Sequence, residues 1–416
     1  MFRTPVRVAA LVVLIIVSPM GLARSHAQTA VGAGPLTGVL SDTEPVTGVL
    51  RAGPILLAPG VTVREVGWDS NVFDEPPEES PKEDWVAAAT PDVSVYARLR
   101  FLRISAYAGS ELTYYHKYES ERSVGYTFRG RFDFLLSRMR PFVGGGRLDT
   151  RTRPNGEIDV RADRKEDELS GGLAFDISPN ALVYASSVFS NTRYEDAIES
   201  GVDLSQSLNR DRTEYQGGLQ TDLTPLLSMQ LYGSYTEDVF QYEPLRNATS
   251  SAANATFRID ASAVVTGVIT VGYRDMQPVD PLSEDFRGFT GNAAIIYPFL
   301  ELGRFYFTAN RGTEYSFDVT EAYYVENSVG VAYTQRLFGE VDAQIRGAWS
   351  VFDYSARADS PPHKDTFNTF GGSVGYNLRN RTRIAVNYED AKRRSPEIAA
   401  RNYDRRRIFL SWAFAF

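Results

Sequence analysis

Apolar and polar side chains alternate along most of the chain from residue 60 onward, in runs of about 10 to 17 residues. The segment 341–351 contains one apolar or small row and one mostly polar row: Val341, Ala343, Ile345, Gly347, Trp349 and Val351 against Asp342, Gln344, Arg346, Ala348 and Ser350. Successive side chains on a strand point to opposite faces of a sheet. The pattern therefore predicts strands with one apolar face and one face in contact with water.

Two kinds of connector alternate between these runs. One kind is short and rich in turn formers, as at 178–180, and the other is longer and charged, as at 195–209. The runs between them give 18 expected strands, at 60–68, 86–98, 101–118, 123–136, 141–153, 164–177, 181–194, 211–223, 226–242, 252–259, 263–276, 286–297, 304–318, 323–335, 339–353, 366–378, 382–393 and 405–416. An even number of strands with short turns at one end is typical of bacterial membrane barrels. We expect an all-β fold, a transmembrane antiparallel up-and-down β-barrel of about 18 strands (16–18), with short periplasmic turns and longer outer loops.

The final strand carries the clearest lipid-facing row. Its alternating apolar residues end at the last position of the chain: Ile408, Leu410, Trp412, Phe414 and Phe416. This row resembles the C-terminal sorting signal that the barrel assembly machinery recognises in outer-membrane barrels. Tyrosines near the expected strand ends, among them Tyr114, Tyr235, Tyr273, Tyr324 and Tyr354, fit outward aromatic girdles. The alternative for the last strand alone is an ordinary buried strand.

The beginning of the chain predicts export. Arg3 and Arg7 precede an apolar run from Val8 to Val17, and a small-x-small pattern ends at Ala27. We therefore expect a signal peptide at 1–27, a flexible periplasmic extension at 28–59 and the barrel at 60–416. The extension is interpreted as a disordered tether, with a docking peptide or a lumen plug as alternatives. The expected location is the outer membrane of a Gram-negative bacterium.

The composition is compatible with a barrel and argues against some classes of binding partner. The 416 residues have a mean hydropathy of -0.27 and include 23 Tyr, 24 Phe and 33 Gly. In a barrel the apolar outer face and the polar lumen average to such a value. The net charge of -8 without a basic segment argues against nucleic acid as a partner. The absence of Cys excludes a lipid anchor on cysteine.

Catalytic patterns are missing. The expected mature chain has two histidines, His116 and His363, and neither has a serine partner at a recognisable spacing. Carboxylate groups such as Glu166-Asp167-Glu168 are interpreted as solvated strand ends. The acidic loop 69–84 could bind divalent cations that bridge lipopolysaccharide, but its spacing is too irregular for a calcium hand. We predict no enzyme activity, no cofactor and no metal site.

Strand parity predicts which side chains face the lumen. The expected inward set combines charged residues with tyrosines: Arg98, Arg103, Glu111, Arg129, Arg131, Asp133, Arg147, Asp149, Asp222, Asp342, Arg346, Arg383, Glu389, Arg407, Tyr96, Tyr107, Tyr232 and Tyr306. Aromatic rings can stack on sugars, and arginines can hold hydroxyls or carboxylates. A barrel of this size can enclose an aqueous channel. The alternative is ordinary strand filler whose charges pair across the lumen.

Several strand-end segments resemble the putative β-barrel porin type 2 family of Gram-negative bacteria: 63–73, 190–194, 209–215 and 272–275. The resemblance covers about residues 60 to 416 and implies a role in exopolysaccharide secretion, as for members encoded with such clusters. The first hypothesis is a pore for polysaccharide export. Its alternatives are a small-solute diffusion porin and a structural or adhesive barrel with a plugged lumen. Expected partners are outer-membrane lipid, lipopolysaccharide, the barrel assembly machinery and periplasmic polysaccharide-export components.

Overall fold

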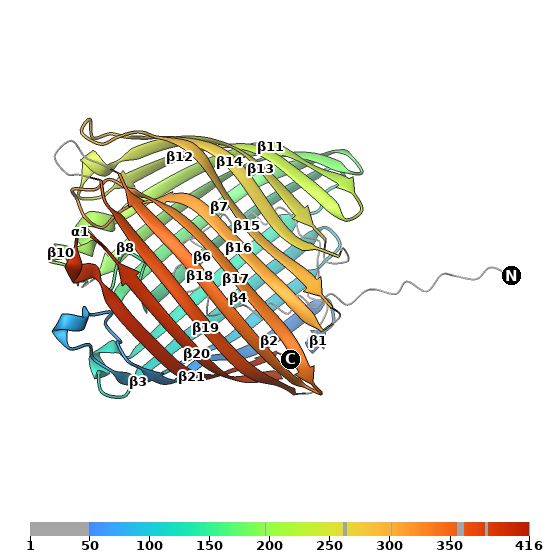
Figure 1. The fold of residues 1–416 in the computed structure, drawn as a ribbon. Helices are drawn as coiled ribbons and strands as arrows, with labels where there is room; N and C mark the ends of the chain where they lie inside the picture. The colour runs from blue at the N-terminus through green and yellow to red at the C-terminus, as the bar shows by residue number, and fades with distance from the viewer. Residues whose placement is uncertain are drawn as a thin grey trace.

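The computed structural model describes residues 50–195, 197–260, 264–300, 302–355, 362–378 and 382–415. These residues form one closed antiparallel barrel of 18 strands (Figure 1), as expected. Its strands are β2 (Ile55–Asp69), β3 (Asp84–Arg98), β4 (Leu102–Tyr115), β5 (Ser123–Phe134), β6 (Met139–Thr152), β7 (Ala162–Ser178), β8 (Ala181–Glu195), β11 (Arg210–Thr224), β12 (Leu227–Phe240), β13 (Ala248–Ile259), β14 (Thr266–Pro278), β15 (Phe286–Phe299), β16 (Gly303–Glu314), β17 (Tyr324–Phe338), β18 (Val341–Tyr354), β19 (Lys364–Leu378), β20 (Thr382–Arg394) and β21 (Tyr403–Ala415).

Short elements lie outside the barrel wall. They are β1 (Leu50–Ala52), which pairs with β2, the two-stranded β9 (Ile198–Glu199) and β10 (Val202–Asp203), the helix α1 (Leu204–Leu208), and four 3-10 turns, η1 (Pro77–Glu79), η2 (Glu119–Glu121), η3 (Pro244–Arg246) and η4 (Ala399–Arg401). No helix among the described residues combines the length and the apolarity needed to cross a bilayer.

The first and last barrel strands close the sheet. β2 pairs with β21 from Gly60 opposite Ala415 to Asp69 opposite Arg407. β1 and the C-terminus lie at one end of the barrel, and α1 and β10 lie at the other (Figure 1). Because β2 begins at Ile55, the first strand starts five residues before the boundary expected at 60. The predicted signal peptide, most of the extension and Phe416 lie outside the described residues.

The two faces of the wall follow the alternation in the sequence. On β18, Ile345 and Trp349 are 59% and 47% exposed on the outer face, whereas Asp342 and Arg346 are buried on the inner face. On β21, Ile408, Leu410 and Trp412 point outward in the same way. Each barrel strand has 12 to 17 residues, more than the roughly 9–11 that a tilted strand needs to cross the hydrocarbon. The strand ends therefore extend beyond the lipid.

Aromatic side chains near the loop end divide between the two faces. Tyr114, Tyr235 and Tyr273 are exposed, as an outward girdle requires. Tyr324 and Tyr354 were expected in the girdle, and this prediction is wrong. Both are buried on the inner side of the wall with Phe352 and Phe367. The inner wall beneath the loops thus carries its own apolar cluster, against which the loops can pack.

The outward apolar row predicts how strongly a charged side chain placed there would destabilise the barrel. Replacing Ile345 by Lys places an ammonium in the hydrocarbon, so the free energy of unfolding should fall by about 2–4 kcal/mol. Gln344→Lys is the matched control, because Gln344 points inward and donates a hydrogen bond to Thr334. The free energy of unfolding of Gln344→Lys should fall by only about 1 kcal/mol. Urea unfolding in lipid vesicles, followed by tryptophan fluorescence, measures both values. Equal losses for the two variants would contradict this assignment of faces.

Candidate functional site

Sixteen of the 18 residues predicted to face the lumen lie on the inner face by strand register. They are Arg98, Arg103, Glu111, Arg129, Arg131, Asp133, Asp222, Asp342, Arg346, Arg383, Glu389, Arg407, Tyr96, Tyr107, Tyr232 and Tyr306. Neighbouring strands present these residues to one another, because directly paired residues of antiparallel strands share a face.

Arg147 and Asp149 do not belong to the inner face. Arg147 pairs directly with Phe128, and Asp149 pairs with Tyr126, on the outward rows of β5 and β6. Phe128 is 52% exposed. The prediction was wrong because Phe142 points inward, where the guanidinium of Arg131 lies 3.8 Å from its ring centroid, and because the glycine run 144–146 carries no side chains that mark a face.

Most inward charges that could be assigned from the sequence are paired. Arg103 and Arg131 both contact Asp133, at 3.3 and 2.8 Å. Arg383 contacts Asp342 at 2.6 Å. Glu389 lies between Arg346, at 3.0 Å, and Arg407. Pairing of this kind lowers the cost of placing charges on a crowded wall, and it reduces the net charge that a passing solute meets.

Two inward charges at the closing seam, Arg64 and Glu65, were not among the residues predicted to face the lumen. The register of β2 shifts between Val63 and Val66, which marks a β-bulge, and a bulge lets two successive residues face the same side. Arg64 contacts Glu111, and Glu65 accepts from Arg407 at 3.0 Å. Strict alternation would place one of the two in the lipid. No feature of the sequence predicts this bulge.

Arg393 on β20 is fully buried on the inner side of the wall. Its side chain has no exposed surface. It contacts Asp365 of β19 at 2.6 Å and Asp159 at 3.1 Å, and it donates to the backbone carbonyl of Glu157 at 3.0 Å. Glu157 and Asp159 belong to the loop 153–161 between β6 and β7, so Arg393 ties this loop to strands on another part of the wall.

A second loop joins the first through the side chain of Glu157. Ser316 donates to Glu157 Oε1 at 2.6 Å, and the N–H of Phe317 donates to Oε2 at 3.1 Å. Ser316 and Phe317 lie between β16 and β17. Ile158 packs against Phe317, and Leu204 and Leu208 of α1 complete the same buried cluster. We call these contacts around Arg393, Glu157 and Ile158 the loop clamp. Three connectors therefore pack together against the inner wall. The connector 153–161 and the one that contains α1 were interpreted as outer loops, whereas Ser316 and Phe317 were expected within the strand 304–318, which ends at Glu314.

Buried acids inside the loop clamp have perturbed pKa values. Burial raises the pKa of Glu157 to about 7, against the opposing effect of Arg401. Burial and the charge of Glu157 raise the pKa of Glu321 to about 8. Glu321 contacts His363 Nδ1 at 3.2 Å and shares the hydroxyl of Ser316 with Glu157. Burial lowers the pKa of His363, so the imidazole is neutral at pH 7. His363 was interpreted as an ordinary loop residue.

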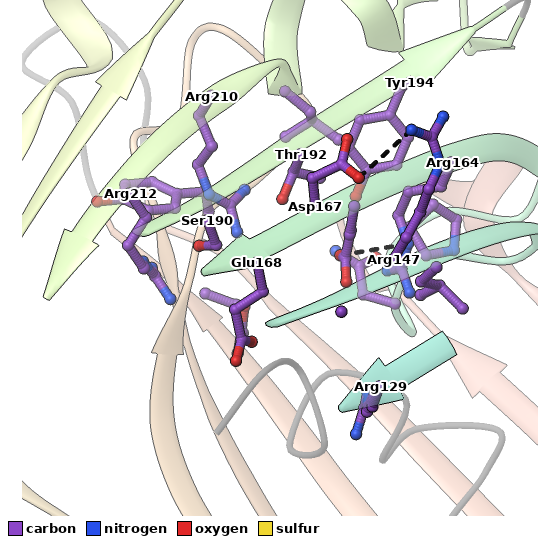
Figure 2. Close-up of a pocket in the computed structure, with 18 residues that line it drawn as sticks. Arg129, Arg147, Arg164, Asp167, Glu168, Ser190, Thr192, Tyr194, Arg210 and Arg212 are labelled. Atoms are coloured by element: carbon purple, nitrogen blue, oxygen red, sulfur yellow. Dashed lines mark ion pairs between the residues drawn. The ribbon is translucent and has the colours of Figure 1, made fainter. Parts of the chain in front are cut away.

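Beside the loop clamp lies an arginine-rich recess. Figure 2 shows Arg129, Arg164, Arg210 and Arg212 around it. Arg212 forms two hydrogen bonds with Asp238, at 2.8 and 3.1 Å, and Arg164 contacts Glu166 at 3.4 Å. Arg129 is exposed and forms no ion pair with another described residue. The recess offers about 110 Å³ of water-accessible space, enough for several waters or a small polar group.

Of the residues around the recess, the sequence had indicated Arg129 and Arg147 as facing the lumen, and Arg147 lies on an outward row. Arg164, Arg210 and Arg212 were left out because they fall at expected strand ends beside charged connectors. Nothing in the sequence separates them from solvated charges. Arg393 was missed for the same reason, since its partners Asp159 and Glu157 lie more than 230 positions away. Among the described residues, no group of three metal-ligating side chains is present.

Comparison with known proteins agrees with this architecture. A family model described as Putative beta-barrel porin 2 matches residues 46–416. A BenF-like porin from Pseudomonas fluorescens Pf-5 is similar with a TM-score of 0.50 and 11% identity, over 86% of this chain and 99% of that chain. OpdK from Pseudomonas aeruginosa, crystallised with vanillate, is similar with a TM-score of 0.49 and 11% identity, over the same shares. No curated protein matches. At such identity the similarity to solved structures concerns the fold.

The loop clamp predicts a role for Arg393 in setting the current. Arg393→Gln removes both ion pairs and leaves the buried Asp365 uncompensated, which costs about 3–5 kcal/mol. The loop 153–161 should detach, and single-channel conductance in planar bilayers should rise. Arg394→Gln is the control, because Arg394 forms an exposed pair with Asp404 at 2.6 Å, worth at most about 1 kcal/mol. Unchanged conductance of folded Arg393→Gln would show that the clamp does not limit the current.

The raised pKa values predict a pH dependence of the same clamp. A carboxyl whose pKa is raised in the packed state contributes stability below its ordinary pKa of 4.5, and this contribution is lost as pH rises through about 7 to 8. Channel fluctuations should therefore increase as the pH rises from about 5 to about 8. The double variant Glu157→Gln, Glu321→Gln cannot ionise at these positions, and its recordings should vary less with pH. Equal pH dependence in both proteins would refute the assignment.

Proposed function

The chain belongs to the Putative beta-barrel porin 2 family and is an outer-membrane β-barrel porin, and we propose that it is a diffusion channel for small polar solutes. One observation carries this proposal. Three loops meet inside the loop end of the barrel, held together by the buried side chains of Arg393, Glu157 and Ile158. The passage left for solutes is therefore narrower than the wall of 18 strands alone would allow.

Export of a polysaccharide is less compatible with this arrangement. A sugar chain needs a continuous open path during its whole transit, so the loop clamp would have to stay open. Opening it breaks the contacts of Arg393 with Asp159 and with the carbonyl of Glu157, and separating a buried ion pair costs several kcal/mol. A small solute can instead pass beside the closed loops. The small-solute alternative from the sequence thus replaces polysaccharide export as the first hypothesis.

The inner wall supports polar solutes without a strong preference for charge sign. Carboxylates neutralise most arginines, as Asp133, Asp342 and Glu389 do. The free guanidinium of Arg129 and the paired arginines of the recess still offer hydrogen-bond donors along a water-filled surface. Hydroxyls and carboxylates of small solutes fit such donors. We therefore expect weak selectivity for charge and strong selectivity for size.

Size selectivity gives the test of this function. Proteoliposomes loaded with dextran should swell quickly in a monosaccharide, slowly in a tetrasaccharide, and not at all in external dextran. Arg393→Gln should speed entry of the tetrasaccharide more than that of the monosaccharide, because only the larger solute is limited by the clamp. Passage of dextran through the wild-type protein would favour export. Absence of swelling and of conductance with folded protein would indicate a plugged lumen.

A further inference from the structure

A groove crosses the outer face of four neighbouring strands, β17 to β20. Gly347 forms its floor, because a Cβ placed there would meet only the carbonyl oxygen of Thr369, at 3.8 Å. Val329, Val331, Trp349 and Phe370 form apolar walls around this floor, and Phe370 is 61% exposed. The strand pairs Val331 with Gly347 and Gly347 with Phe370 place these residues in one outward row. The groove therefore faces the hydrocarbon and not the lumen.

Polar side chains form one end of this groove. Asn368 pairs with Lys392, and Phe370 pairs with Asp390, which lies opposite Arg406 on β21. Lys392 is half-exposed and is 3.9 Å from Asp390, too far for a hydrogen bond. Arg406 is exposed and forms no ion pair with another described residue. Two cations beside the groove thus keep free hydrogen-bond donors.

The outward cations elsewhere on the wall have a different arrangement. On β7 and β8, Lys165 contacts Glu195 and Arg193 contacts Asp211, both at 2.7 Å. Those cations are paired within the protein. Unsatisfied positive charge and an open apolar groove coincide at β19 to β21.

An unpartnered acceptor completes the polar end. Asp390 Oδ1 is buried and has no hydrogen-bond partner among the described residues. A buried acceptor without a donor is costly, so a bound molecule that donates an O–H or N–H there would be stabilised. The groove end thus offers two cations for an anionic group and one acceptor for a neighbouring donor.

We propose that this groove binds lipopolysaccharide of the outer leaflet. An acyl chain lies over Gly347 between Trp349 and Phe370, a phosphate of the glucosamine head contacts Lys392 and Arg406, and a hydroxyl or amide N–H of the head donates to Asp390. The polar end of the groove lies toward the loop end of the strands, which is the outer side when both termini are periplasmic. Cations and acceptor lie at the boundary where such a head group meets its acyl chains.

Native mass spectrometry of the full mature chain in detergent tests this proposal, with Kdo2-lipid A as the probe and phosphatidylglycerol as the comparison lipid. Wild-type protein should bind Kdo2-lipid A more tightly than phosphatidylglycerol. The double variant Lys392→Gln, Arg406→Gln should bind it about tenfold more weakly or worse, since each charged contact contributes at least about a factor of ten. Gly347→Leu fills the groove and should weaken binding similarly.

The matched control is Lys165→Gln, Arg193→Gln, which removes two outward cations that are already paired. Its affinity should stay within about twofold of wild type. Equal affinity of the groove variants and wild type would overturn the proposal, as would equal binding of both lipids. A change of oligomeric state in Gly347→Leu would assign the groove to a second copy of the chain instead. Channel conductance of all these variants should match wild type, so failure here leaves the proposed function untouched.

Discussion

The structure depends on one constraint: a backbone N–H or C=O group in hydrocarbon must find its partner within the protein. A sheet with a free edge cannot meet this condition, so β2 and β21 have to pair. These strands are the two ends of the barrel in sequence. Closure therefore places Gly60 beside Ala415 and Asp69 beside Arg407, so the first and last strands form the seam.

The seam carries more inward charge than strict alternation would provide. The bulge in β2 turns both Arg64 and Glu65 inward, where Glu65 meets Arg407 and Arg64 meets Glu111. Arg405 adds contacts with Asp69, at 2.9 Å. A bulge weakens the backbone ladder locally, and the side-chain pairs across the same strands offset this loss. The irregular backbone pairing of β2 and the dense ion pairing thus occur at the same place.

The barrel could be predicted from the sequence because its strongest signal is local. Alternation along a strand needs only neighbouring residues, and it located 18 strands and the inward face of most of them. It failed on β6, where Phe142 points inward under Arg131 and three glycines mark neither face. It also failed for the loop clamp, because the contact of Arg393 with Asp159 joins residues 234 positions apart. The charge of a loop says little about whether it points to solvent or folds inward.

The inner face of the wall carries arginines, whereas none of the five lysines lies on it, and the reason follows from the cost of buried charge. The chain has five lysines. Lys82 and Lys117 lie in loops, and the other three, Lys165, Lys364 and Lys392, lie on outward rows near the loop end. The inner face uses arginine, whose planar fork can serve two carboxylate oxygens at once, as Arg383 does for Asp342. This geometry suits a crowded inner wall, where a single arginine can satisfy both oxygens of a half-buried carboxylate. At the membrane boundary, a flexible ammonium that reaches toward head groups is the better choice.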